Sequence, residues 1–396
     1  MKNIYYICGH FTDLVEYHEL CSFFQKFFPE VKQHLMLVEH PYFSLVNYRK
    51  FLEGFDSVIR LPVCECAYTN RWYYELLPWI IFKRFIDVKA FLNEEKKISF
   101  QDDSLCIISE MTEATLSVRL LLRKFRTETI HSVICRIGPC YHRSLECDTN
   151  SWLSWLLHNK YILIGAYPVS VYLYGWMVVE RRYYQERNII DCFLVFSKKF
   201  EKHDDYIEIK YPLIENKQFE TQQKRFVFFF DDGLGWTSLF SNISREKWIA
   251  TMNQILHALT DLYRDENVVL LLKAHPAENG NIPYDLAGFE IYNKNETSEM
   301  IYSMRKEEIR AVYSVASTSS RSASLYGIDS YVFYEMFDFP EKVMARHKRY
   351  LLDFSNVVSI RNLNLLQKPE LKNYSLPTTN KDLEQLAQLF RELNKR

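Results

Sequence analysis

The chain is short of glycine and proline and carries no excess charge of either sign. Its 396 residues include only 10 glycines and 12 prolines, beside 27 tyrosines and 28 phenylalanines, which excludes a collagenous or low-complexity chain. The formal net charge of −1 provides no global field that would attract nucleic acid, so we expect no nucleic-acid partner. Because single cores stop growing well below this length, two domains of about 150–200 residues are expected.

Cysteine is present, but not in a pattern that indicates disulfides or zinc. All nine cysteines lie between Cys8 and Cys192, and spacings such as Cys64-Glu65-Cys66 are not those of zinc sites. The opening residues Met1–Cys8 are typical of a buried strand rather than of a signal peptide. We therefore expect buried thiols in a reducing cytoplasm, and no metal site.

One long uncharged run raises the question of a membrane span. Tyr161–Val179 has 19 residues without charge, but Pro168 and two glycines interrupt it, which favours two buried elements. The segment Trp72–Arg84 is aromatic with basic residues at its end, a pattern of helices that lie at a bilayer surface. An ordinary core helix is the favoured interpretation of that segment. Peripheral contact with the inner face of a bacterial plasma membrane is thus one expectation.

Strand-like and helical patterns alternate along the chain, which predicts an α/β fold of two Rossmann-like, doubly wound domains. We expect a first domain over residues 1–205, a second over 206–375 and a terminal helix over 376–396, with a polar linker at Glu201–Arg225. The expected strands of the first domain are Ile4–Cys8, His34–Val38, Ser57–Leu61 and Leu105–Ile108, with a helix at Leu14–Phe28. Those of the second are Phe226–Phe230, Val268–Leu272, Phe289–Tyr292, Ala311–Val315 and Asp329–Tyr334.

Helical patterns in the second half complete this arrangement. Ser244 resembles an N-cap, and apolar residues follow it at helical spacing as far as Leu262. Further helices are expected near Thr297–Met304 and at Ser319–Tyr326. In the terminal helix, Lys381–Leu393, one face collects the apolar residues, so this helix should dock on a neighbouring surface.

Three short motifs follow strand-like runs of the second domain. They are Asp231-Asp232-Gly233, Lys273-Ala274-His275-Pro276 and Ser317-Thr318-Ser319-Ser320. Open α/β sheets bind ligands outside the carboxyl ends of their strands, so these motifs are expected to meet in one crevice.

The chemistry of the motifs points to a phosphate. Hydroxyls and backbone N–H groups at a helix N-terminus, as at Ser317–Ser320, bind phosphate, whereas simple helix capping would need only one hydroxyl. His275 follows a buried strand, a candidate neighbour of the strand before the hydroxyls, and an imidazolium there stabilises or protonates a leaving phosphate.

The acidic motif fits two roles. Asp231 or Asp232 at a strand end, next to Gly233, can accept a proton from an attacking hydroxyl, or can simply close an Asx turn. The pair Asp102-Asp103 and the later Glu110 and Glu113 flank another strand and are rival bases.

Together the motifs resemble those of bacterial sialyltransferases of the GT-B fold, which carry D/E-D/E-G, HP and S-S/T motifs. Lys273–Pro276 is similar to that family's longer K-G-H-P form, and Thr297–Ile301 to the segment whose glutamate grips the nucleotide ribose. The resemblance covers about residues 226–336. It implies a CMP-sialic acid donor, inversion at the anomeric carbon, a glycan or glycolipid acceptor bound by the first domain, and no metal or other cofactor.

Site roles follow from the resemblance. Asp232 would be the general base and His275 the acid that stabilises the phosphate. The donor-binding residues would be Asp231, Gly233, Lys273, Pro276, Glu299, Ser317, Thr318 and Ser319. In several family members the acidic motif lies in the first domain, whereas here it opens the second. If Asp232 lines the donor side, Glu110 or Glu113 would supply the base.

Other functions stay open at this point. A CMP-Kdo transferase needs the same phosphate and cytidine contacts. CDP-glycerol glycerophosphotransferases also use a His-Pro strand end, but normally show Asp-Tyr-Ser-Ser where this chain has Ala316–Ser319. A non-catalytic glycan-binding scaffold is the alternative from another class. The leading hypothesis is a transferase that extends a lipooligosaccharide, capsule or O-antigen.

Overall fold

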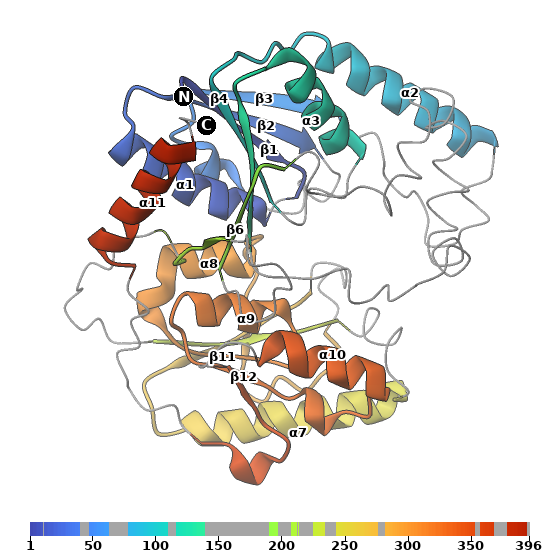
Figure 1. The fold of residues 1–396 in the computed structure, drawn as a ribbon. Coiled ribbons are helices and arrows are strands. Elements are labelled where there is room, and N and C mark those ends of the chain that lie inside the picture. The colour runs from blue at the N-terminus through green and yellow to red at the C-terminus, as the bar shows by residue number, and fades with distance from the viewer. Residues whose placement is uncertain are drawn as a thin grey trace. The chain divides into compact units, whose positions relative to one another are not determined.

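The computed structural model divides the chain into two compact units, each considered by itself (Figure 1). It describes residues 1–10, 12–39, 47–62, 78–109, 116–138, 190–196, 207–211, 213, 225–233, 243–275, 282–352, 357–367 and 378–393. The first unit comprises Met1–Ser44, Tyr48–Leu213 and Asn380–Arg396, and the second comprises Leu45–Asn47 and Ile214–Thr379.

The first unit is built on a seven-stranded parallel sheet in the order β3-β2-β1-β4-β5-β6-β7. Its strands are β1 (Asn3–Cys8), β2 (Lys32–Glu39), β3 (Ser57–Pro62), β4 (Ser104–Ser109), β5 (Val133–Gly138), β6 (Cys192–Val195) and β7 (Ile207–Glu208). The central strands β1 and β4 are buried at every position, as expected of parallel strands covered on both faces.

Helices cover both faces of this sheet. They are α1 (Asp13–Phe27), α2 (Pro78–Glu95), α3 (Leu116–Glu128) and α11 (Asn380–Leu393), with a 3₁₀ turn at Arg49–Leu52. Tyr5 of β1 meets Phe125 of α3 at a ring distance of 6.0 Å, whereas its neighbour Tyr6 meets Tyr17 of α1 at 5.5 Å on the other face. The alternation of side chains along β1 therefore assigns α1 and α3 to opposite faces.

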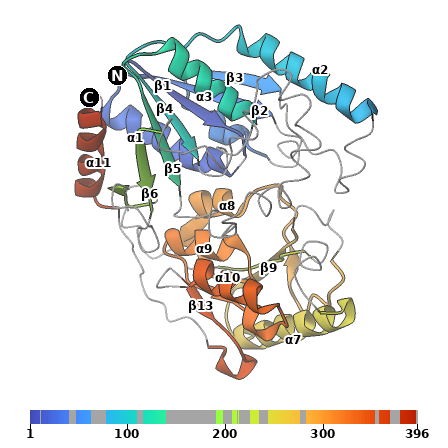
Figure 2. The same ribbon diagram turned by 45° about the vertical axis from the view of Figure 1, so that its right-hand side comes forward.

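The terminal helix α11 packs on α1, although more than 350 residues separate them in the chain. Its buried residues are Leu383, Leu386, Ala387, Phe390 and Leu393, the face that helical spacing predicts. The ring of Phe390 lies 4.8 Å from that of Phe24 and 6.1 Å from that of Phe23. Both views show α11 beside α1 (Figures 1 and 2).

The second unit holds a six-stranded parallel sheet in the order β10-β9-β8-β11-β12-β13. Its strands are β8 (Phe226–Phe230), β9 (Val269–Lys273), β10 (Glu290–Ile291), β11 (Ile309–Ser314), β12 (Ser330–Val332) and β13 (Val357–Ser359). Its helices are α7 (Arg245–Tyr263), α8 (Ser298–Arg305), α9 (Thr318–Leu325) and α10 (Glu341–Leu351), with short 3₁₀ turns at Lys306–Glu308, Tyr334–Met336 and Leu363–Leu365.

Residues of β8 point alternately toward two helical layers. Phe229 belongs to the core cluster that contains Trp248 and Met252 of α7. Phe230 lies 5.8 Å, between ring centroids, from Tyr302 of α8 on the other face. Ser244 caps α7 as predicted, because its side chain accepts a hydrogen bond from Lys247 N at 3.3 Å. The prediction of two doubly wound α/β domains with a C-terminal helix is confirmed.

Some predicted boundaries were wrong. The segment interpreted as a linker contains β7, which pairs with β6 and extends the first sheet. The strand predicted at Asp329–Tyr334 ends at Val332, because the chain turns into a 3₁₀ helix at Tyr334. Tyr161–Val179 and residues 72–77 lie outside the described residues. Within the described part of the chain, no helix is both long and apolar enough to cross a bilayer.

The packing of α11 on α1 should make a measurable contribution to stability. Phe390 is 1% exposed, so Phe390→Ala should lower the free energy of unfolding by about 3–5 kcal/mol, the usual cost of removing a buried ring. Urea unfolding measures this. Leu365→Ala, at a position that is 51% exposed, is the matched control and should change stability by less than about 0.5 kcal/mol. Equal losses in both variants would contradict the docking of α11.

Candidate functional site

The second sheet changes its winding direction at β8. The chain passes from β8 to β9 and β10 on one side, and then crosses back to β11 on the other. Phe230, the last residue of β8, pairs with Lys273 of β9 and with Ser314 of β11, and both pairings are parallel. The carboxyl ends of three neighbouring strands therefore share one edge of the sheet, at the topological switch point where open α/β sheets hold ligands.

Each of the three motifs follows one of these three strands. Asp231–Gly233 comes after β8, Lys273–His275 ends and follows β9, and Ser317 follows β11 as the N-cap of α9. The histidine strand and the hydroxyl strand are not direct neighbours, because β8 lies between them, which corrects the adjacency considered from the sequence. The acidic motif thus occupies the central position. Pro276 lies outside the described residues.

The serines of the β11–α9 loop form a connected set of hydroxyls. Ser317 Oγ accepts a hydrogen bond from Ser319 N at 3.2 Å and donates one to Ser319 Oγ at 3.1 Å. Ser317 N donates to Ser314 Oγ at 3.2 Å, and that hydroxyl shares a 2.7 Å hydrogen bond with Ser320 Oγ. Ser314 and Ser320 are fully buried, whereas Ser317 is half-buried and Thr318 is exposed. The inner hydroxyls hold the loop, and Ser317 and Thr318 form its accessible part.

Asp232 ties the acidic motif to this loop. Its Oδ2 accepts a hydrogen bond from Ala316 N at 2.8 Å, and the amide of Val315 also contributes. The residue is only 8% exposed. Burial raises the pKa of the Asp232 carboxyl to about 7, against the opposing effect of the amide of Ala316. A carboxyl at the end of β8 thus fixes the backbone directly before Ser317.

Asp231 has a different role from its neighbour. Its Oδ1 accepts hydrogen bonds from Gly233 N and from the hydroxyl of Tyr284, both at 3.2 Å. Tyr284 in turn accepts from Trp248 Nε1 at 3.2 Å, which connects the turn to α7. Gly233 has a φ of 77°, in the left-handed region that glycine adopts most easily. Asp231 therefore closes an Asx-type turn after β8, whereas Asp232 stabilises the loop after β11.

Glu299, in the first turn of α8, connects that helix to α9. Its carboxylate accepts from Ser298 Oγ at 3.0 Å and from Ser322 Oγ of α9 at 2.8 Å. Thr297 caps α8, accepting from Met300 N at 3.2 Å. These contacts fix Glu299 beside the middle of α9.

The β9 end of the site carries two basic side chains, both half-buried. Burial lowers the pKa of the Lys273 ammonium, while the charge of Glu296 opposes that effect. Lys273 Nζ lies 6.0 Å from the ring centre of Tyr292, and His275 stands two residues further on. Lys273 and His275 thus place nitrogen donors at the same sheet edge as the hydroxyls.

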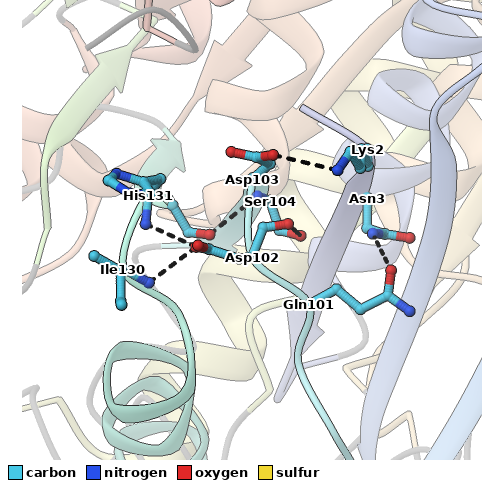
Figure 3. A network of polar contacts seen from close by, with 9 residues as sticks. Lys2, Asn3, Gln101, Asp102, Asp103, Ser104, Ile130 and His131 are labelled. Carbon is cyan, nitrogen blue, oxygen red and sulfur yellow. Dashed lines mark hydrogen bonds and ion pairs between the residues drawn. The ribbon is translucent and has the colours of Figure 1, made fainter.

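Two of the rival carboxylates of the first unit, Asp102 and Asp103, lie among the described residues. They precede β4 and so lie at its amino end, whereas open α/β sheets bind ligands at the carboxyl ends of their strands. Figure 3 shows Asp102 accepting from Ile130 N at 2.9 Å and His131 N at 2.7 Å, and Asp103 paired with Lys2. This pair is structural, which corrects its status as a rival base. Glu110 and Glu113 lie outside the described residues.

Local sequence patterns do not reveal all of the support around the motifs. Tyr284 lies in a loop with no distinguishing pattern, and Ser314 resembles an ordinary strand residue. Only the pairing of distant strands shows that these side chains hold the Asp231 turn and the Ser317 loop. In the described part of the chain, no group of three or more His, Cys, Asp or Glu residues has the arrangement of a metal site.

Comparison with known proteins identifies the architecture. No family model and no curated protein matches this chain. A solved structure of the glycosyltransferase of kitacinnamycin aligns with a TM-score of 0.50 and 11% identity over 100% of this chain and 95% of its own. The GT-B domain of a sialyltransferase from Photobacterium damselae aligns with a TM-score of 0.46 and 11% identity. The alignment covers 91% of this chain and 100% of that one.

A protein of a different activity aligns at a similar level. A Listeria monocytogenes structure described as a putative UDP-N-acetylglucosamine 2-epimerase has a TM-score of 0.47 and 10% identity, covering 100% of this chain and 89% of that one. The chain has the fold of GT-B glycosyltransferases. At such identities the fold alone is shared, so the details of function have to be argued from the strand-end residues.

The buried carboxyl of Asp232 should make stability depend on pH. A raised pKa means that the folded state holds this proton up to about pH 7, whereas the unfolded carboxyl loses it near pH 4. The protonated Asp232 carboxyl therefore contributes its full stability below about pH 4, and this contribution to the free energy of unfolding is lost as the pH rises to about 7. The free energy of unfolding of Asp232→Asn, measured relative to wild type by urea unfolding, should therefore increase by about 2–3 kcal/mol as the pH rises from about 5 to about 8.

The control for this experiment is Asp261→Asn, which removes a carboxylate that is 64% exposed on α7. This variant should show no such gain over the same pH range. A stability difference between Asp232→Asn and wild type that stays constant from about pH 5 to pH 8 would show that Asp232 is ionised in the folded protein throughout.

Proposed function

We propose that the protein is an inverting glycosyltransferase that moves sialic acid, or a related nonulosonic acid, from a CMP-sugar to a bacterial surface glycan. One observation carries the proposal: the acidic, histidine and hydroxyl motifs all stand at the carboxyl ends of β8, β9 and β11. The motif types and their order resemble those of GT-B sialyltransferases, and the chain has the fold of GT-B proteins.

The donor phosphate would bind at the start of α9. The helix dipole and the hydroxyls of Ser317 and Thr318 favour an anion there, and Ser319 completes the loop. Asp232 keeps this loop in place through Ala316 N, and Glu299 holds the second turn of α9 through Ser322 Oγ. The site is thereby formed before the donor arrives, which lowers the entropy lost on binding.

His275 would act on the departing nucleotide. The acceptor hydroxyl attacks the anomeric carbon, and the bond from that carbon to the phosphate oxygen breaks, so CMP leaves with the bonding electrons. Negative charge grows on the phosphate, where a protonated imidazole stabilises it or donates a proton. Lys273 and Pro276 would line the donor site next to His275, and Glu299 would contact the ribose.

The acceptor's proton needs a base. Asp232 is the first candidate, because a carboxyl with a pKa of about 7 is half ionised near neutral pH, which suits general base catalysis. Its hydrogen bond from Ala316 N also supports the second possibility, in which Asp232 only organises the donor side. Glu110 or Glu113 of the first unit would then be the base.

The remaining parts of the proposal follow from the motif resemblance. The reaction would need no metal, and activity that survives EDTA would agree with this. The acceptor would be a lipooligosaccharide, capsule or O-antigen glycan, reached from the cytoplasmic side at the inner membrane surface. A CMP-Kdo transferase or a CDP-glycerol glycerophosphotransferase would use the same phosphate site, so these are the alternatives. Turnover of a CMP-sugar would exclude a purely glycan-binding protein.

The role of His275 predicts a specific loss of catalysis. His275→Ala should lower the rate of sugar transfer from CMP-sialic acid by about two orders of magnitude or more, as expected when an acid–base group is lost. His257→Ala is the control, because His257 is exposed on α7 and pairs with Asp285 at 2.9 Å. Turnover of His275→Ala at the wild-type rate would remove His275 from the mechanism.

The hydroxyl loop predicts a loss of nucleotide affinity. Ser317→Ala combined with Thr318→Ala should weaken CMP binding by about tenfold or more, because two hydrogen bonds to a charged phosphate are lost. Calorimetry measures the dissociation constant. Ser244→Ala is the matched control, because it removes the N-cap of α7 and costs about 1 kcal/mol of stability without touching the site. Intact affinity in the double variant would count against the phosphate site.

A further inference from the structure

Exposed apolar side chains gather on one helix of the first unit. Among the described residues, seven large hydrophobic side chains are at least 40% exposed, and three of these lie on α2: Trp79 (65%), Phe82 (67%) and Ile86 (52%). The other four lie apart in the chain: Ile130 in the loop after α3, Ile291 on β10, Val358 on β13 and Leu365 in the last 3₁₀ turn. Single exposed hydrophobics are normal, but a group of three within about two turns calls for a cause.

These three residues form a continuous stripe on the outer face of α2. They are spaced by three and four positions, so they lie one above another on the helix surface. Val88 and Phe91, on the opposite face, are 1% and 0% exposed and belong to the core cluster of the first sheet. Figures 1 and 2 both show α2 on the outer side of this unit. The stripe Trp79-Phe82-Ile86 therefore points away from the core that anchors the helix.

Positive charge borders the stripe. Lys83 and Lys89 are exposed and lie on either side of it by helical position. The acidic residues nearest to it are placed differently: Asp87 is only half-exposed, and Glu94, about two turns further on, pairs with Lys97 at 2.6 Å. Aromatic residues with flanking lysines are the composition of helices that lie at the boundary between lipid head groups and acyl chains.

We infer that the Trp79-Phe82-Ile86 face of α2 docks on an anionic lipid bilayer. The helix would lie in the plane of the surface, with its rings among the head groups and Lys83 and Lys89 against lipid phosphates. It cannot cross the membrane, because Lys83, Asp87 and Lys89 interrupt its apolar character. The docking itself does not depend on the proposed function. Only its biological role, which is to bring the enzyme to a membrane-bound acceptor, rests on that function.

Binding of the full-length protein to vesicles tests the inference without any nucleotide or sugar. The probes are vesicles of phosphatidylcholine alone and of phosphatidylcholine mixed with phosphatidylglycerol, separated by flotation. Wild type should bind the mixed vesicles, more weakly as salt increases. Trp79→Ser with Phe82→Ser should lower partitioning by about tenfold or more. Lys83→Gln with Lys89→Gln should lower it by about tenfold, and only on the anionic vesicles.

Control variants separate lipid binding from misfolding and from self-association. Ile130→Ser changes a side chain that is 83% exposed in the same unit and should bind vesicles like wild type. Because Trp79, Phe82, Lys83 and Lys89 are all exposed, the variants should unfold at the wild-type temperature.

Three results would overturn the inference. The first is that wild type does not float with anionic vesicles, and the second is that Trp79→Ser with Phe82→Ser floats equally well. The third is that wild type forms dimers that dissociate in this double variant, which would assign the face to a second copy instead. CMP binding remains a separate measurement, so a failure here leaves the proposed donor site standing.

Discussion

The site depends on one hydrogen bond, in which Ala316 N donates to the carboxylate of Asp232 at 2.8 Å. This contact joins the end of β8 to the loop after β11, so the acidic and hydroxyl motifs are positioned by each other. Because the carboxyl is buried at the centre of the strand-end row, its pKa rises to about 7. Burial of Asp232 thus has two effects: it keeps the hydrogen bond to Ala316 N away from solvent, and it makes the carboxyl change its protonation state near neutral pH.

Much of this arrangement could be predicted from local pattern. Apolar runs such as Phe226–Phe230 and capping residues such as Ser244 specify their own elements, and the buried face of α11 follows from helical spacing. The order of strands could not be predicted, because it depends on pairing between distant segments. For that reason local pattern alone leaves Asp102 and Asp103 among the rival bases, although they lie at the amino end of β4. The different roles of Asp231 and Asp232 likewise depend on their contacts with Tyr284 and Ala316, and no local sequence pattern predicts those contacts.

The two units share one plan but differ in what they present to their surroundings. Both sheets wind outward from their first strand and reverse at it, which gives each unit a switch point. In the second unit this point carries the phosphate-binding chemistry that we propose. Among the described residues of the first unit, the exposed stripe on α2 is a feature that packing of the core does not explain. A transferase acting on a membrane-bound acceptor needs both a donor site and a means of staying at the membrane, and these features match the two requirements.

The most direct measurement is the melting temperature of the wild-type protein with CMP, CDP, UDP or GDP at equal concentrations. A ligand that binds only the folded state stabilises it by about 2.7 kcal/mol at about one hundred times its dissociation constant. If the strand ends of β8, β9 and β11 hold a cytidine nucleotide by its phosphate, CMP should raise the melting temperature, and UDP and GDP should leave it nearly unchanged. Equal shifts with all four nucleotides, or no shift with CMP, would contradict the assignment of this site to a CMP-sugar.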